Sequence, residues 1–89
     1  MTDIIKAAAA GTMESSDVYV EIEPAEGIEI QLESVVKGQF GNAIEAVVRE
    51  VLEECAVTNA KLHVVDRGAL DCVIRARVET AVLRGKGEV

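Results

Sequence analysis

The sequence predicts a two-layer α+β fold, in which a mostly antiparallel sheet carries two helices on one face. Two short runs, 18–23 and 28–33, alternate between apolar and polar residues as half-buried strands do. The segment 36–56 instead repeats its apolar residues at helical spacing. A strand and a second helix follow. The predicted order is therefore β-β-β-α-β-α, in one domain spanning residues 1–89 with frayed termini at about 1–6 and 85–89.

The first strand is expected over about residues 8–14. Alanine, which dominates its beginning, favours helix intrinsically, but Gly11 and Thr12 break that preference. The next strand, 18–23, turns its odd and even residues to opposite faces, with the valines and isoleucine on one side.

A turn at 24–27 separates the two alternating runs. Its proline fixes the backbone angle φ of its own position, and its glycine can adopt backbone angles that strain other residues. Two alternating runs across a short turn are typical of a β-hairpin, so we expect 18–23 and 28–33 to pair as antiparallel neighbours. The outer face of this hairpin would be exposed to solvent and acidic.

The longer helix is expected over about residues 36–56, and its apolar stripe should cover the dry face of the sheet. Glu45 and Arg49 lie four apart on the opposite side, in the favourable order for an ion pair. The predicted stripe comprises Phe40, Ala43, Ile44, Val47, Val48, Val51, Leu52 and Cys55.

A fourth strand at 60–65 and a helix at about 69–83 complete the prediction. His63 would face away from the helices because its neighbours in the strand point inward. Arginines in the later turns of the helix, among them Arg77, would complement its dipole. The predicted stripe of this helix comprises Leu70, Val73, Ile74, Val78, Ala81 and Val82.

Charge and composition narrow the possible partners. The net charge of −7 argues against a nucleic-acid partner, because phosphate backbones are bound by an excess of Lys and Arg. An acidic domain of 89 residues is suited instead to meeting basic patches of other proteins. Aromatic residues make up only 2% of the chain, so the core must be built from Val, Ile, Leu and Ala.

The cysteines indicate no disulfide or metal site. Cys55 and Cys72 both fall in apolar stretches, so we expect them to be buried as small hydrophobic residues. With His63 as the single histidine, we expect no structural zinc site. We find neither a secretory signal nor a run of membrane-spanning length, so we expect a cytoplasmic protein with no membrane partner.

The segment 10–17 is the most distinctive part of the chain. Gly11 permits backbone angles closed to other residues, and Ser15, Ser16 and Asp17 can hydrogen-bond their own backbone in turns. On these physical grounds alone the segment is a solvated hairpin tip. The strand-elbow pattern of a hydrolase serine is absent, so we expect neither hydroxyl to be catalytic.

Three stretches together resemble a known family. They match, in order and at suitable spacing, the marker stretches of citrate lyase acyl carrier proteins, which are the small gamma subunit of that enzyme. The family pattern has a glycine after the motif serine, where this chain has Ser16. The three stretches are Gly11-Thr12-Met13-Glu14-Ser15 with Asp17 two places on, Gln39-Phe40-Gly41, and the segment 68–80.

The resemblance implies a carrier with a covalent arm. In this family the motif serine is linked through a phosphodiester to phosphoribosyl-dephospho-CoA, whose thiol carries acetyl or citryl as a thioester. That serine matches Ser15, with Ser16 as the second choice. The implied partners are the alpha (transferase) and beta (lyase) subunits of citrate lyase and a prosthetic-group transferase, and the carrier itself catalyses nothing. The resemblance also favours a hairpin around the serine.

Two other functions stay open. The carrier of malonate decarboxylase uses a similar group at a serine, although the segment 68–80 favours citrate lyase. From a different class, the chain could be an unmodified α+β interaction domain that binds partners through its acidic sheet face. A free-standing enzyme is least favoured, because no carboxylate pair, metal cluster or nucleophile-base set emerges.

Overall fold

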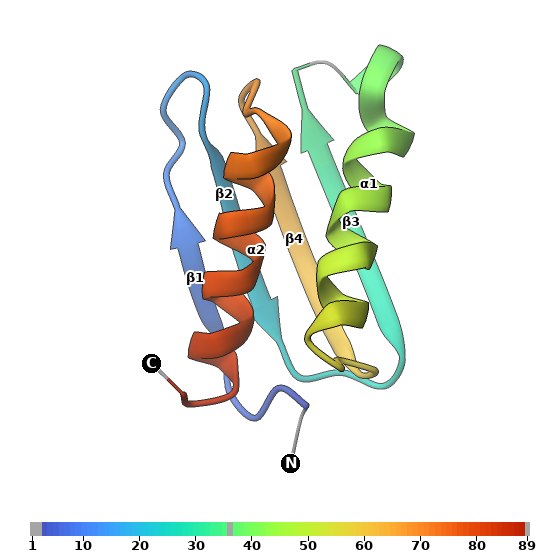
Figure 1. Ribbon diagram of the computed structural model, residues 1–89, viewed down its shortest axis with the longest axis vertical. Helices are drawn as coiled ribbons and strands as arrows, with labels where there is room; N and C mark the ends of the chain where they lie inside the picture. The colour runs from blue at the N-terminus through green and yellow to red at the C-terminus, as the bar shows by residue number, and fades with distance from the viewer. Residues whose placement is uncertain (1–2, 36, 89) are drawn as a thin grey trace.

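The computed structural model describes residues 3–35 and 37–88 and confirms the α+β prediction. One sheet is covered on a single face by both helices, in the predicted order of elements (Figure 1). The elements are β1 (Ala8–Gly11), β2 (Val18–Glu23), β3 (Ile28–Ser34), α1 (Lys37–Glu54), β4 (Ala60–Asp66) and α2 (Asp71–Gly85).

The predicted hairpin between β2 and β3 is wrong. The strand order is β1-β2-β4-β3, so β4 lies between the two strands and pairs with both. It runs antiparallel to β2 and parallel to β3, which makes the sheet mixed, with two antiparallel pairs and one parallel pair. The connection from β2 to β3 therefore passes the N-terminal end of β4, where the Ala60 N–H donates to the Gly27 carbonyl at 2.9 Å.

The central place of β4 follows from its side chains. Every second residue of β4 is fully buried, from Ala60 to Asp66, whereas the apolar residues of β3 are only half-buried. A strand that has neighbours on both edges and helices on one face is the most shielded from water. Placing the more apolar strand there therefore stabilises the fold most. The segment β3-α1-β4 is a parallel β-α-β unit, whose long connection the intervening helix supplies.

The helices bury the stripes that their periodicity predicts, with small shifts at the ends. Helix α1 packs on β3, and α2 packs on β1 and β2. The Glu45–Arg49 pair forms, at 3.0 Å between Oε2 and Nε. Ala43 and Leu70 are exposed, contrary to prediction, because each lies in or just before the first turns of its helix. The expected burial of Phe40 concerns a side chain outside the described part, as does the predicted start of α1 at residue 36.

The core between the sheet and the helices is aliphatic, as predicted. The side chains that are most deeply buried between the layers are Val18, Val20, Ile22, Val48, Leu62, Val64, Ile74, Val78 and Val82. Cys55 is half-buried and Cys72 is exposed, so the prediction of burial was wrong for Cys72, which lies in the first turn of α2 outside the buried stripe. Both cysteines are free.

The ends of the described chain pack against the rest of the fold. Ile4 is buried, and its neighbour Ile5 donates its backbone N–H to the Gly85 carbonyl at 2.9 Å. Lys86 reaches back to the residue that follows α1, where its Nζ donates to the Cys55 carbonyl at 2.6 Å. Within residues 3–35 and 37–88, neither helix has the length and hydropathy that crossing a bilayer requires.

Candidate functional site

The candidate site is the loop that joins β1 to β2, residues 12–17. Figure 1 shows this loop at the same end of the molecule as the connection between β4 and α2 and the N-terminal ends of both helices. Ser15 and Ser16 are both exposed there. The loop prediction is thus correct, although β1 ends at Gly11 rather than near residue 14.

Gly11 fixes the beginning of the loop. Its φ is +92°, and a Cβ added to it would lie 1.8 Å from the Val18 carbonyl oxygen. No side chain fits such a contact, and the opposing atom belongs to the backbone of the paired strand. The first residue of the family motif is therefore a structural requirement of the hairpin.

The serines occupy the two central positions of a β-turn. The Asp17 N–H donates to the Glu14 carbonyl at 3.1 Å, which closes the turn. Ser16 has a φ of +66°, as the third residue of a type II turn requires, and glycine is the usual residue there. Ser16 therefore adopts the backbone conformation that suits the glycine of the family pattern, and Ser15 occupies the position before it.

Backbone hydrogen bonds attach the turn to the sheet. The Ser16 N–H donates to the Arg67 carbonyl at 2.8 Å, and the Arg67 N–H donates to the Asp17 carbonyl at 2.9 Å. These two bonds continue the pairing of β2 with β4 beyond Val18 and Asp66. The Arg67 side chain adds a third link, from Nη1 to the Met13 carbonyl at 3.1 Å.

The Asp17 carboxylate is the centre of the site's polar contacts. Its Oδ2 accepts the Thr12 hydroxyl at 2.6 Å, and its Oδ1 accepts the Val18 N–H at 2.7 Å. Arg77 of α2 donates to both oxygens, from Nε at 3.1 Å and from Nη2 at 3.2 Å. The Thr12 hydrogen bond, followed by that of Val18 and the nearby Arg77, lowers the pKa of Asp17 to about 2. At neutral pH the group is an ionised anchor between the loop and α2.

The serine hydroxyls take no part in this network. Within the described residues, neither Ser15 nor Ser16 has a side-chain hydrogen bond to the protein, so no base is hydrogen-bonded to either hydroxyl. The surrounding contacts hold the backbone of the turn and leave the hydroxyls to solvent. Such an arrangement can present an attachment point, and among the described residues no side-chain base is hydrogen-bonded to it.

The arginines of the site were not predicted from the sequence. We assigned Arg77 to the helix dipole, whereas it binds Asp17, and Arg75 likewise pairs with Glu50 of α1, at 2.6 Å between Nη2 and Oε1. A signal was available in the motif stretches. The first contains Asp17 and the third contains Arg77, so two stretches far apart in sequence meet at one site. The side chains of Gln39 and Phe40, from the middle stretch, lie outside the described part.

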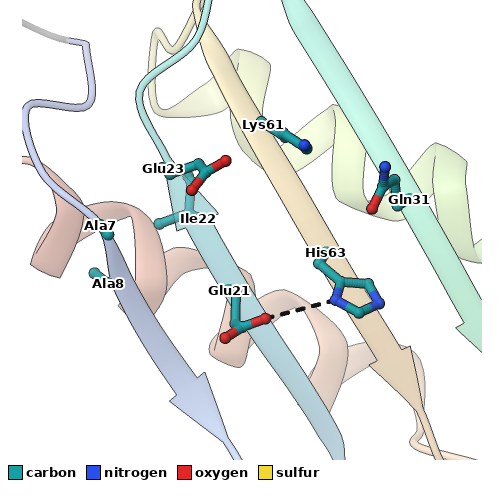
Figure 2. Close-up of a pocket in the computed structure, with 8 residues that line it drawn as sticks. All are labelled: Ala7, Ala8, Glu21, Ile22, Glu23, Gln31, Lys61 and His63. Atoms are coloured by element: carbon teal, nitrogen blue, oxygen red, sulfur yellow. Dashed lines mark ion pairs between the residues drawn. The ribbon is translucent and has the colours of Figure 1, made fainter.

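The open face of the sheet carries a second polar cluster, around a depression of about 260 Å³ (Figure 2). His63 lies between two carboxylates, with its Nδ1 3.5 Å from Glu21 Oε1 and its Nε2 bonded to Glu33. This position confirms that His63 faces away from the helices. Among residues 3–35 and 37–88, no three His, Cys, Asp or Glu side chains are placed to hold a metal ion together.

Comparison with known proteins adds three findings. A family model described as the malonate decarboxylase delta subunit matches residues 5–85. The citrate lyase acyl carrier protein of Escherichia fergusonii is 57% identical over 84 residues, which covers 92% of this chain and 87% of that protein. The citrate lyase acyl carrier protein of Haemophilus influenzae strain PittEE is 52% identical over 85 residues, which covers 96% of this chain and 90% of the relative.

One solved structure supports the fold independently. It is a chain from the crystal structure of a Pseudomonas malonate decarboxylase hetero-tetramer in complex with malonate, with a TM-score of 0.77. The match covers 89% of this chain and 82% of that chain at 22% sequence identity. At that identity the likeness concerns the fold alone.

Proposed function

This chain belongs to the family of citrate lyase acyl carrier proteins, and on that premise we propose that it is the acyl carrier subunit of a citrate lyase. It carries acetyl or citryl as a thioester on a phosphoribosyl-dephospho-CoA arm that is attached to Ser15. The observation that carries this proposal is the exposed Ser15, presented by a turn whose backbone is fixed on both sides.

The turn geometry favours Ser15 over Ser16 as the attachment point. Ser16 takes the left-handed conformation, and its N–H is committed to Arg67. In the attachment step, the Ser15 Oγ bonds to the ribose-linked phosphorus of an arm that is activated as a phosphoric anhydride, and the bond from that phosphorus to the departing phosphate group breaks. The hydroxyl proton passes to a base of the attaching enzyme, because no base among the described residues of this chain is hydrogen-bonded to Ser15.

The carrier contributes position rather than chemistry. A thioester is more electrophilic than a carboxylate, and a tethered acyl group has a high effective concentration at each active site that the arm reaches. The alpha subunit would exchange acetyl for citryl on the arm and release acetate. The beta subunit would then cleave the citryl thioester to oxaloacetate and restore the acetyl carrier. A rigid attachment point limits the volume that the arm must search.

The test is an intact mass of the protein from its native host, followed by peptide mapping of residues 11–17. We expect the mass of the arm on Ser15, its loss in Ser15→Ala and its retention in Ser16→Ala. The arm on Ser16 would keep the function and refute the attachment point. An unmodified chain, in a host shown to contain the attaching enzyme, would favour the unmodified interaction domain.

Malonate decarboxylase remains a second candidate because the matching family model carries that description. The two functions differ in the acyl group and in the reaction of the assembled complex. Purified with its neighbouring subunits, the carrier of a citrate lyase supports cleavage of citrate to acetate and oxaloacetate. A carrier of the other class supports loss of CO₂ from malonate instead.

A further inference from the structure

Three large hydrophobic side chains are exposed at the end of the molecule that carries the serines. Among the side chains that the structure describes, the exposed large hydrophobic residues are Ile5, Met13, Val35 and Leu70. Met13 is 50% exposed, Val35 66% and Leu70 71%. Ile5 lies at the opposite end, since its backbone bonds to Gly85 at the C-terminal end of α2.

The three side chains come from different loops, yet hydrogen bonds to the last residue of β4 and to the turn after it join those loops. The Val35 N–H donates to the Asp66 carbonyl at 3.3 Å, and Arg67 donates to the Met13 carbonyl at 3.1 Å. Leu70 is the last residue of the connection between β4 and α2. We call Met13, Val35 and Leu70 the apolar rim. The serine turn belongs to this assembly as well, through the bond from Ser16 to Arg67.

The fold gives no reason for leucine at position 70. Leu70 is the N-cap of α2, with φ −73° and ψ 157°, and no side chain caps the helix there. Serine, threonine, asparagine or aspartate would satisfy a free N–H at this position, whereas an exposed leucine adds apolar surface to solvent. Leucine at this position neither caps the helix nor interacts favourably with water. Its presence is explained if another molecule covers it.

We propose that the apolar rim is the surface that docks on the enzyme that attaches the prosthetic group, an inference that rests on the proposed function. The reacting atom of that step is the Ser15 Oγ itself, so the enzyme's active-site opening must come within bonding distance of the turn. Its surface then has to lie over the loops around the turn. Active sites that are served by the long arm need no such approach.

Charge and size define the chemistry of this partner. Glu14 adjoins Met13 and Asp71 adjoins Leu70, both exposed, while the exposed Arg67 donates to the Met13 carbonyl, in a chain of net charge −7. The complementary surface is an apolar contact around the active-site opening, with Lys or Arg opposite the two carboxylates. Three side chains by themselves do not supply the roughly 1,200 Å² or more that a stable interface buries, so we infer a transient contact.

The test compares rim variants with a matched control in attachment kinetics. Met13→Gln, Val35→Gln and Leu70→Ser each remove apolar surface, and Ile5→Gln makes the same change at the opposite end. We expect kcat/KM for attachment, followed by intact mass, to fall about tenfold for each rim variant, chiefly through KM, and to stay unchanged for Ile5→Gln. Leu70→Ser adds a helix cap, so its attachment should slow while its thermal stability rises or holds.

Each alternative result has a definite meaning. If the wild-type chain is never labelled by the attaching enzyme, the proposed function fails, and the rim inference fails with it. If the wild-type chain is labelled and the rim variants are labelled at the same kcat/KM, only the rim inference is overturned. Equal slowing by Ile5→Gln would also overturn it, as would normal attachment combined with slower turnover in the assembled lyase.

Discussion

Asp17 is the residue that holds the serine turn in place. Its carboxylate accepts hydrogen bonds from Thr12, Val18 and Arg77, and its pKa is lowered to about 2, chiefly by the Thr12 hydroxyl. An unfolded aspartate titrates near pH 3.9. Above that pH the stabilisation is fully present, and it is lost as pH falls from about 4 through 2, because the unfolded state takes up the proton first.

We therefore expect Asp17→Asn to weaken the acid dependence of stability. The wild-type free energy of unfolding, measured by urea titration at pH 7 and pH 3, should fall toward the lower pH. The variant should be less stable at pH 7 and should lose less between the two values. An equal loss in both proteins would assign the acid dependence to other carboxylates, such as Asp3, whose pKa is also lowered, chiefly by its hydrogen bond from the Asn59 side chain.

Gly11 allows a sharper test, because the chain provides a matched control. Both Gly11 and Gly27 have positive φ, at +92° and +72°, but only at Gly11 would a Cβ strike the opposing backbone. We expect Gly27→Ala to cost about 1 kcal/mol from conformational strain alone. Gly11→Ala should cost roughly 2 kcal/mol more, because β1 or β2 must shift. Urea unfolding midpoints of the two variants measure the difference, and equal midpoints would contradict the clash.

The site was only partly predictable at the level of residues. Small polar residues after Gly11 predict an exposed turn, because their local hydrogen bonding is encoded within a few positions. The bond from Asp17 to Arg77 is not encoded locally, since 60 positions separate the two residues. An arginine in the later turns of a predicted helix has a local role with the helix dipole, and only the three-dimensional packing shows the longer-range partner.

At the scale of elements, periodicity identified β2, β3, β4 and both helices, but neither β1 nor the neighbours within the sheet. Alternation with a period of two tells which face of a strand is buried, and this is the same for an edge strand and a central one. The β2–β3 connection therefore resembled a hairpin turn. The order of β3, α1 and β4 carried the better signal, because a strand-helix-strand unit favours parallel pairing.

Helix α2 begins without a side-chain cap, which makes its stability easy to raise. Leu70 has the extended backbone of an N-cap residue but no group to bond a free N–H. We expect Leu70→Asp to stabilise the protein by about 1 kcal/mol, through a cap hydrogen bond and the favourable helix dipole. Leu70→Ala removes the same apolar surface without a cap and serves as the control. Equal thermal midpoints for the two variants would exclude the cap as the cause.

At the scale of the whole molecule, the end opposite the serines is closed by a polar network. Asp3 accepts hydrogen bonds from the backbone N–H groups of Thr58 and Asn59, at 2.9 and 3.2 Å, and from the Asn59 side chain at 2.9 Å. The Asn59 Oδ1 in turn accepts the Gly27 N–H at 2.8 Å. One side chain thus joins the N-terminal segment, the β2–β3 connection and the loop before β4.

This separation of a stabilising end from a functional end can be tested with Asn59→Ala. Loss of its hydrogen bonds should lower the free energy of unfolding by about 1–2 kcal/mol. Attachment of the arm to Ser15 should proceed at the wild-type rate, because the turn and the apolar rim are held by contacts at the other end. Asn42→Ala, at an exposed position of α1, is the control for removing an asparagine. Slower attachment to folded Asn59→Ala would mean that the two ends are coupled through the sheet.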